Sequence, residues 1–442
     1  MPKAEQTGAG HTGTGQAGAG QDDTGQAGAR QARLAGALLV AGIVVLSVNL
    51  RAAITSLPPV FPELSRSLGL SPAALDLLAA VPVLCFGVFS GAAAPLGRRF
   101  GEERVLGAAL ALLAAGLLLR GALPQVLLFP GTVLAAGAIA LMNVLLGSLI
   151  KRRRADQAGL LVGLYLTTMS VGAIVASVTA VPLFEAAGGD GPGSRLVLGL
   201  WALPALAAVA AWLPQLRLRT RPAAVAPGGR GGVRQMARYR LAWQVMAFMG
   251  LQSLSYYAAL SWFPTMFRDR GLSPEVAGDL LALMNLGNAV TALLVPVLAH
   301  RARDQRALVA AAMVATSVGL AGSVYAPAGS AAAWVLLLGL GQGATLGLGI
   351  FLTMARAPDP ATAAALSGFA QGAGYLIAAT GPPLVGVLHA ATGGWSVPVA
   401  ALLVVAVAQL ITGSLAGRAL TVPSVSHQPH GHQPASRPDA AV

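Results

Sequence analysis

One arginine stands out because it lies inside a stretch that is otherwise apolar enough to enter a lipid bilayer. The stretch VNLRAAITSLPP, residues 48–59, contains Arg51, with Asn49 two residues before it and Thr55 one helical turn after it. A guanidinium stays charged at physiological pH and offers a planar set of donors that suits anions with two oxygens. Charges at membrane depth are costly and usually serve a function. We therefore expect Arg51 to bind a solute that carries negative charge or partially negative oxygens.

Two other roles remain open for Arg51. Its long side chain can reach the outer headgroups, or it can form a structural pair with Asp76, which is expected at a similar depth. Thr55 shares the helical face of Arg51 and is expected to orient the same solute. Asn49 lies off that face, so a hydrogen bond to a neighbouring helix is as good an interpretation for it as solute contact.

Polar side chains spaced by one helical turn recur in later apolar segments. Residues three or four positions apart face the same way from a helix, so each pair can point into one cavity. Tyrosine rings in such a cavity would flank a flat, small solute, whereas Trp262 is expected in the aromatic belt at a membrane interface. The further candidates for solute binding are Tyr165, Gln252, Tyr256, Asn285, Asn288, Gln371 and Tyr375.

No soluble catalytic motif accompanies these residues. The sequence contains no GxSxG, HExxH or Walker motif and no spaced set of Cys and His. Gly339, Gly343 and Gly347 resemble a phosphate loop only superficially, because no Lys-Ser/Thr pair follows them. Their spacing of four predicts a smooth helix face for close packing. We therefore expect neither an enzyme nor a cofactor or metal site.

The elements that position these residues are expected to be transmembrane helices. The chain has 442 residues, of which 55% are hydrophobic and 10% charged, whereas about a quarter of a soluble domain is charged. Its net charge of +13 is spread over short loops, so the expected partners are the lipid bilayer and a small solute, not nucleic acid. An all-α fold with twelve spans near the ~20-residue crossing length is predicted. The apolar segments are 34–58, 73–96, 104–121, 126–150, 158–183, 195–213, 241–266, 275–299, 307–327, 331–354, 362–389 and 396–417.

Charge distribution predicts the orientation of these spans. With the N-terminus inside, cytoplasmic segments hold 23 of the 29 Lys and Arg residues; the opposite side holds five, and Arg51 is the remainder. Positive charge concentrates on the cytoplasmic side of membrane proteins. We therefore predict a plasma-membrane protein, most simply a monomer, with both termini inside.

A long basic segment divides the chain into two sets of six spans. The N-terminal tract is rich in Gly, Ala, Gln and Thr and cannot bury enough apolar surface to fold; it and the His-containing C-terminal tail are expected to be disordered. The predicted divisions are an N-terminal tail at 1–32, a bundle at 33–213, a cytoplasmic linker at 214–240, a second bundle at 241–418 and a C-terminal tail at 419–442.

The two halves are sequence repeats. FPELSRSLGLSP begins at Phe61 and FPTMFRDRGLSP begins at Phe263, and the same offset pairs Arg99 with Arg301. An even number of spans separates the copies, so the repeats share one orientation, as in the two halves of the major facilitator architecture. The serine before the final proline of each stretch is expected to cap the next helix, with the proline at its first position.

Several stretches resemble the cyanate and nitroimidazole permease family of the major facilitator superfamily. They include NLRAAITSLPPVFPEL, FMGLQSLSYYAALSWFPTMFRDRGLSPEVAGDLLALMNLGN and LSGFAQGAGYLIAATGPPLVGVLHAATGGW, and the resemblance runs from about residue 34 to 418. The loop SGAAAPLGRRFGEER keeps the superfamily's basic pair, Arg98 and Arg99, but has Ala94 at its acidic position. The resemblance, with the repeat, implies gating roles for Arg98, Arg99 and Arg301.

The function implied by this resemblance is transport of a small solute. We expect a secondary active or facilitative transporter of a cyanate-like anion or a nitroimidazole-like heterocycle, working by alternating access. A multidrug-type efflux antiporter is the alternative within transport. A membrane-embedded enzyme would need clustered His, Asp or Glu inside the membrane, and a sensor would need a sizeable soluble domain; the sequence favours neither.

Overall fold

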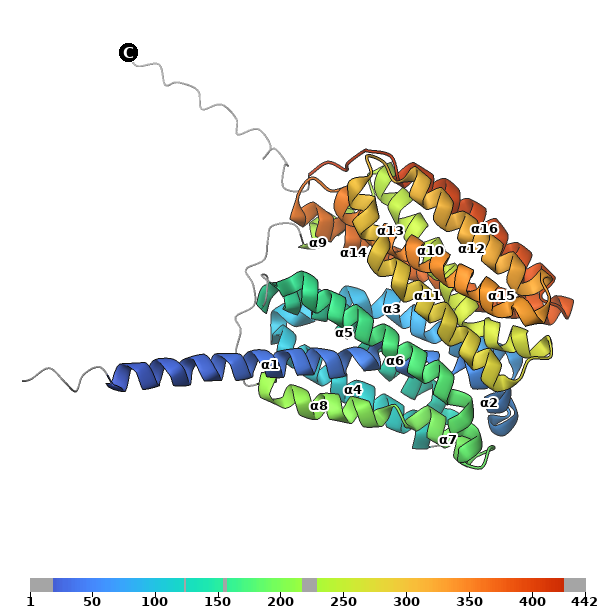
Figure 1. Cartoon of the computed structure of the whole chain (residues 1–442), viewed down its shortest axis with the longest axis horizontal. Helices are drawn as coiled ribbons and strands as arrows, with labels where there is room; N and C mark the ends of the chain where they lie inside the picture. Colours follow the sequence, from blue (N-terminus) through green and yellow to red (C-terminus); the bar gives the residue numbers. More distant parts are fainter. Residues whose placement is uncertain (1–18, 123–124, 154–156, 217–228, 425–442) are drawn as a thin grey trace, which may run out of the picture.

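The computed structural model describes residues 19–122, 125–153, 157–216 and 229–424, and this part is helical throughout (Figure 1). The first half contains long helices that run back and forth between the two ends of the molecule. They are α1 (Ala19–Thr55), α3 (Pro72–Phe100), α4 (Glu102–Ala122), α5 (Leu128–Arg153), α6 (Ala158–Ala186) and the pair α7 (Pro192–Gly199) and α8 (Ala202–Leu216). Short connecting helices are η1 (Pro58–Val60), α2 (Phe61–Leu68) and η2 (Gln125–Leu127).

The second half repeats this arrangement. Its helices are α10 (Arg240–Asp269), α11 (Pro274–Arg301), α12 (Arg306–Tyr325), α13 (Ala331–Ala355), the pair α14 (Pro360–Ala378) and α15 (Gly381–Thr392), and α16 (Ser396–Ala416). The short helices α9 (Gly229–Met236) and η4 (Ala328–Ser330) complete the described part. Figure 1 shows the two halves as separate groups of helices lying side by side.

The predicted all-α membrane fold is confirmed. Within the described residues, eleven helical segments are long and apolar enough to cross a membrane. The remaining predicted span, 241–266, corresponds to α10, which is 30 residues long. Gln, Ser and Tyr side chains interrupt its apolar positions, and this explains why α10 is not among the eleven. Each of the twelve predicted segments therefore lies on a helix or helix pair.

The local structure of the two repeats is the same. Ser71 accepts a hydrogen bond from the backbone of Ala74, and Ser273 accepts one from Val276, so each serine caps the helix that follows. Proline occupies the first turn of both helices. A glycine with positive φ follows the helix before each cap, Gly69 with 59° directly after α2 and Gly271 with 86° two residues after α10, a conformation that glycine adopts without steric cost.

The chain ends and the linker contain more helix and more packing than composition predicts. Helix α1 begins at Ala19, inside the expected tail 1–32, and α9 lies inside the expected linker 214–240. Beyond the second bundle, Val422 is buried and its backbone N–H donates to the carbonyl oxygen of Arg356. Residues 217–228 and most of the expected C-terminal tail lie outside the described part.

Glycines bring α11 and α13 into close backbone contact. A Cβ at Gly339 would lie 2.3 Å from the backbone oxygen of Met284, and one at Gly343 would lie 2.0 Å from that of Asn288. Both distances are too short for any side chain. The glycine series in α13 is therefore a packing surface, as its spacing of four predicts.

A buried arginine joins three helix ends in the first bundle. Arg120, in the last turn of α4, donates to the carbonyl oxygens of Leu198 at 3.2 Å and Ala53 at 3.1 Å. Those carbonyls lie near the ends of α7 and α1, where backbone oxygens lack helical partners. Among the described residues, carbonyl oxygens and not carboxylates accept the hydrogen bonds of this charge, and one Nη atom has no partner there.

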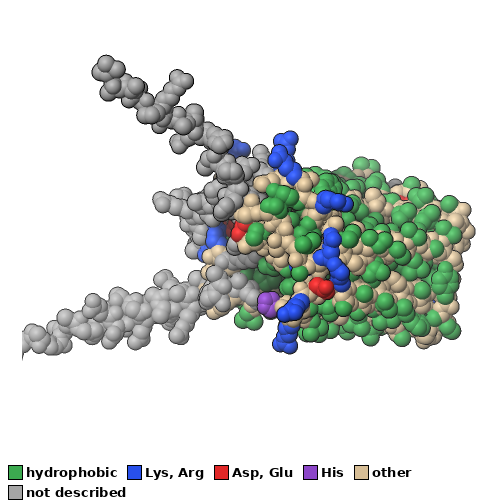
Figure 2. Space-filling view, turned by 90° about the horizontal axis from the view of Figure 1, so that it is seen from above, with side chains coloured by type: hydrophobic (Ala, Val, Ile, Leu, Met, Phe, Trp, Pro, Cys, Tyr) green, Lys and Arg blue, Asp and Glu red, His purple; other side chains and the backbone are tan. Residues whose placement is uncertain are grey.

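Positive charge distinguishes one end of the molecule from the other. Figure 2 shows Lys and Arg side chains gathered toward one end, while hydrophobic side chains cover most of the rest of that face. Arg99 and Arg301 lie in the last turns of α3 and α11, and Arg418 follows the end of α16; we call this the basic end. The opposite end, which contains the turns at Gly69 and Gly271, is called the far end below.

Candidate functional site

The candidate site lies where the two bundles meet, at Arg51. This residue is on α1, and its Nη1 atom donates to the hydroxyl oxygen of Tyr256 on α10 at 2.8 Å. Its guanidinium carbon also lies 4.9 Å from the centre of the Tyr256 ring, within the range of a cation–π interaction. The first bundle therefore supplies the charge and the second supplies its partner.

Tyr256 also forms a hydrogen bond to a third helix, α11. Its hydroxyl donates to Oδ1 of Asn285 on α11 at 2.8 Å, and Asn285 in turn donates to the backbone oxygen of Leu281 at 2.9 Å. Tyr256 and Asn285 are both 3% exposed. The hydrogen bonds fix the Tyr256 hydroxyl as the acceptor toward Arg51, so three residues predicted from sequence lie together.

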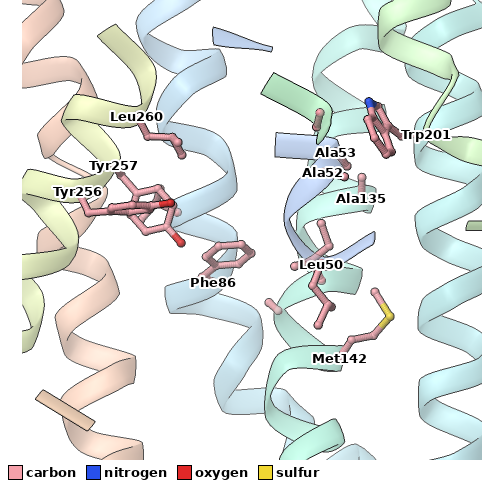
Figure 3. Packing of buried hydrophobic residues seen from close by; sticks show 14 of the residues in the cluster. Leu50, Ala52, Ala53, Phe86, Ala135, Met142, Trp201, Tyr256, Tyr257 and Leu260 are labelled. Carbon is pink, nitrogen blue, oxygen red and sulfur yellow. The ribbon is translucent and has the colours of Figure 1, made fainter. Parts of the chain in front are cut away.

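Aromatic side chains surround the guanidinium. Tyr257 on α10, Tyr375 on α14 and Tyr165 on α6 lie in the neighbourhood of Arg51, and the Tyr257 ring lies edge-on to that of Tyr256 at 5.3 Å. Phe86 on α3 lies between the bundles, with its ring centre 6.2 Å from that of Tyr257 and 5.6 Å from that of Tyr375. Figure 3 shows Tyr256 and Tyr257 projecting from α10 toward Phe86.

No carboxylate neutralises Arg51 among the described residues. Arg51 forms no ion pair within 4.0 Å there, so the alternative role as a structural partner of Asp76 is not seen. Asp76 packs instead against α15, where a Cβ at Gly386 would lie 1.6 Å from its Oδ1 atom. That oxygen is buried and accepts no hydrogen bond from the described residues. The charge of Arg51 is thus left with phenol groups as its nearest polar neighbours.

Two residues near Arg51 in sequence bond to neighbouring helices of their own bundle. Asn49 donates to the carbonyl oxygen of Pro204 on α8 at 3.2 Å, which matches the helix-packing interpretation. Thr55 donates to the carbonyl oxygen of Ala173 on α6 at 3.2 Å and is fully buried. Thr55 also donates to the backbone oxygen of Arg51 at 3.1 Å, and neither side chain is hydrogen-bonded to the guanidinium within the described residues.

The remaining predicted polar residues lie partly at the site and partly inside the second bundle. Gln252 donates to the backbone oxygen of Gln342 on α13 at 3.4 Å, while Asn288 is 4% exposed and its amide nitrogen has no partner among the described residues. Gln371, one turn from Tyr375, is partly exposed and donates to Ser367 at 2.9 Å. Of the pair Gln371 and Tyr375, it is Tyr375 that lies near Arg51.

Sequence reasoning misses three side chains at this site. Tyr257 lies edge-on to Tyr256, Phe86 packs against Tyr257 and Tyr375, and Asn143 on α5 accepts a hydrogen bond from Tyr165 at 3.4 Å. Tyr257 directly follows Tyr256 in sequence, and this adjacency is the one signal that could have identified it. Phe86 and Asn143 are single residues in apolar runs with no partner at helical spacing, so periodicity does not identify them.

The bundles are packed together at the far end. Trp262 is 7% exposed, donates to the carbonyl oxygen of Pro382 at 2.8 Å and lies edge-on to Phe61 of the first bundle at 6.3 Å. The expectation that Trp262 belongs to a lipid-facing belt is therefore wrong. A Cβ at Gly278 on α11 would also lie 2.8 Å from the backbone oxygen of Ser177 on α6. The far end of the interface is closed in this structure.

The proposed gating arginines lie at the basic end. Arg99 is exposed, with its guanidinium carbon 5.2 Å from the ring centre of Phe100, and Arg301 is the exposed last residue of α11. Neither forms an ion pair in the part of the chain that is described. The side chain of Arg98 lies outside the described part. Gating by these residues stays a prediction.

Comparison with known proteins places the chain in a family. The profile described as Major Facilitator Superfamily matches residues 43–382. A 2-nitroimidazole transporter of Escherichia coli (strain K12) is 40% identical over 380 residues, which cover 86% of this chain and 95% of the relative. The cyanate transport protein CynX of the same organism is 31% identical over 362 residues, covering 80% and 90%.

Solved structures show the same fold. A bacterial homologue of the human lysosomal transporter Spinster, in an inward-facing and unoccupied conformation, superposes with a TM-score of 0.71 at 15% identity, covering 87% of this chain and 97% of that one. The two relatives cover 86% and 80% of this chain, and the solved structure shares its helical fold. The chain therefore belongs to the Major Facilitator Superfamily and is a secondary transporter.

Proposed function

We propose that this transporter carries a small planar solute with negative charge or partially negative oxygens, and that Arg51 is its main binding charge. The observation that supports the proposal is the environment of Arg51, which is bonded to the Tyr256 hydroxyl at the interface between the bundles and forms no ion pair among the described residues. A charge in a membrane protein interior is costly without a partner. A solute with negative oxygens would supply that partner during transport.

The rings around Arg51 favour a flat solute within this class. A nitro group presents two oxygens in one plane, as a carboxylate does, and so matches the fork of a guanidinium. Phe86, Tyr257 and Tyr375 would cover the faces or edges of an attached ring, because aromatic groups pack well in offset or edge-on arrangements. A nitroimidazole-like heterocycle uses both features, whereas a cyanate-like anion uses the charge alone.

We further propose that the basic end faces the cytoplasm of a plasma-membrane protein. Positive charge is enriched on that side, and the closed far end would then face outward. One chain contributes both halves of the site, Arg51 from the first bundle and Tyr256 from the second, so a monomer is sufficient. Rocking of the two bundles around this site would open it to either side.

Uptake into proteoliposomes tests the solute class. We would compare 2-nitroimidazole, imidazole without the nitro group, and cyanate, each radiolabelled. Wild-type protein is expected to transport 2-nitroimidazole in preference to imidazole, because only the former offers oxygens to Arg51. Arg51→Lys keeps the charge but loses the fork, and uptake should fall about tenfold, since a hydrogen bond to a charged group contributes about 1.5–3 kcal/mol.

The neutral variant decides the role of the charge. Arg51→Gln should abolish uptake while its thermal unfolding and membrane insertion stay close to those of the wild type. Arg303→Gln, which removes an exposed charge at the basic end, serves as the control and should transport normally. Wild-type uptake by a correctly inserted Arg51→Gln protein would reject the proposal, and equal uptake of imidazole would reject the nitro-group preference.

A further inference from the structure

A groove on the surface of the second bundle is separate from the solute site. It lies at the basic end, where α12 begins and α16 ends, and has a volume of about 450 Å³. Two of its residues are arginines, three are aliphatic and one is a serine. The lining residues are Arg306, Leu410, Ile411, Ser414, Leu415 and Arg418.

Hydrogen bonds from a buried arginine hold the walls of this groove in place. Arg356, which is 5% exposed, donates to the carbonyl oxygens of Ala416 at 2.9 Å and Gly417 at 3.1 Å, and also to the side chain of Gln305. The backbone N–H of Gln305 donates to the carbonyl oxygen of Gly417 at 3.1 Å. The end of α16 is thereby tied to the start of α12, so the groove is formed without a ligand.

The polar end of the groove is positively charged. Arg306 is the first residue of α12 and is exposed, and its guanidinium makes no hydrogen bond within the described residues. Arg418 donates from Nε to the carbonyl oxygen of Leu415 at 2.9 Å and contacts Gln244 at 3.4 Å with one Nη atom. Ser414 has a hydroxyl with no hydrogen bond among the described residues. The nearby Asp304 accepts from the backbone of Arg306.

The apolar end of the groove continues along α16. Leu415, Ile411, Val407 and Val404 are spaced by three or four residues, so they lie on one helical face. All four side chains are exposed, with Val404 at 70% and Val407 at 58%. From Leu415 to Val404 this stripe extends ~17 Å at the helical rise of about 1.5 Å per residue, which is about half of a ~30 Å hydrocarbon core.

We propose that this groove binds one anionic phospholipid of the cytoplasmic leaflet. The phosphate would lie between Arg306 and Arg418, where a helix N-terminus adds favourable backbone dipoles, and an acyl chain would follow the stripe on α16. The two arginines and the apolar stripe thus lie in the same order as the phosphate and the acyl chain of a phospholipid. Basic pockets at the cytoplasmic ends of membrane helices suit anionic headgroups. The assignment rests on the orientation proposed above, in which the basic end is cytoplasmic.

Lipid binding to the purified full-length protein tests this proposal. Detergent-solubilised protein would be titrated with phosphatidylglycerol or phosphatidylcholine, and bound lipid would be counted by native mass spectrometry. One phosphatidylglycerol should bind at least tenfold more tightly than phosphatidylcholine. The double variant Arg306→Gln/Arg418→Gln should remove that preference, and Arg306→Lys/Arg418→Lys should restore most of it.

Matched controls separate a defined site from general attraction to a basic surface. Arg238→Gln/Arg303→Gln removes the same number of exposed charges at the basic end and should leave the preference intact. Equal losses in both double variants would overturn the proposal, as would wild-type affinity in Arg306→Gln/Arg418→Gln. Displacement of the lipid by inorganic phosphate at millimolar concentration would instead indicate a free-anion site and reject the lipid. Binding is measured without transport, so this result is independent of the solute proposed for Arg51.

Discussion

The carboxylate of Glu63 in α2 accepts two hydrogen bonds from the guanidinium of Arg268 in α10, at 2.7 and 2.5 Å, and this pair joins the bundles at the far end. The two side chains are 9% and 17% exposed. Arg268 is the repeat counterpart of Arg66, but the counterpart of Glu63 is Thr265. The second copy therefore lacks the acid needed for a symmetrical pair, and the interface has one such ion pair among the described residues.

Removal of the charge of Glu63 is expected to shift the balance between the conformations in which the far end is closed and open. Glu63→Gln keeps the shape of the side chain but removes its charge, so we expect the far end to open more often. A loss of about 1.4 kcal/mol would change the ratio of open to closed molecules tenfold. Labelling of Ser177→Cys by an impermeant thiol reagent, in a Cys85→Ser background, would measure the change because Ser177 is buried at this interface.

Arg66 provides the control for this measurement. It lies 3.6 Å from Glu63, but its side chain is 67% exposed and it belongs to the same bundle. Arg66→Gln should leave labelling at the wild-type rate. Unchanged labelling in Glu63→Gln would show that the pair does not hold the far end closed.

Tyr256→Phe should weaken solute binding. The variant keeps the ring but removes the hydroxyl that joins Arg51 to Asn285, so the guanidinium loses the group that orients it. We expect the KM for uptake to rise about tenfold, since hydrogen bonds to charged groups contribute about 1.5–3 kcal/mol. Tyr257→Phe is the matched control, because the Tyr257 hydroxyl has no hydrogen bond among the described residues. Equal effects of the two variants would argue against an orienting hydroxyl.

Gly386→Ala should hinder closure of the far end. The new Cβ would lie 1.6 Å from Oδ1 of Asp76, so the bundles could not approach to their present distance. Overpacking of this kind costs about 1–3 kcal/mol, and the uptake rate should fall accordingly. Combining it with Asp76→Ala removes the clashing oxygen and should recover part of the rate relative to Gly386→Ala. A double variant whose loss is the sum of the two single losses would contradict direct contact.

Reporter fusions test the proposed orientation. The segment 214–240 contains seven arginines, and positively charged loops stay on the cytoplasmic side. Alkaline phosphatase folds to its active form only outside the cytoplasm, so a fusion within this segment should be inactive. A fusion after Gly189, in the turn at the far end, should be active. The reverse pattern would invert the orientation.

The architecture is accessible from sequence because the membrane imposes a simple rule on length and polarity. Each span needs about 20 apolar residues, and the matched stretches at Phe61 and Phe263 reveal the repeat by their residues alone. Arg51 can be identified for the same reason, since a charge in an apolar run is conspicuous. Tyr256 and Asn285 follow from the polar residues of other helices, which have to surround that charge.

The contacts of individual polar residues are harder to predict from sequence. Asn49 and Thr55 are close to Arg51 in sequence, yet both bond to carbonyl oxygens within their own bundle. Periodicity shows which residues share a face but not which neighbour that face meets. Trp262 illustrates the same limit, because a tryptophan near a helix end fits either a lipid interface or the contact with Phe61 that it makes.

The polarity of α10 has a consequence for how the protein is made. This helix carries Tyr256 and packs against α13, α14, α15 and α16, all of which are synthesised after it. Its own side chains give it a weaker preference for lipid than the other spans have, so these later helices must supply the protein surroundings that its polar groups need. Stable integration of α10 in the bilayer is therefore expected to wait for the rest of the second bundle, and a nascent chain that stops after α10 should release this helix to water or to the quality-control proteases of the membrane.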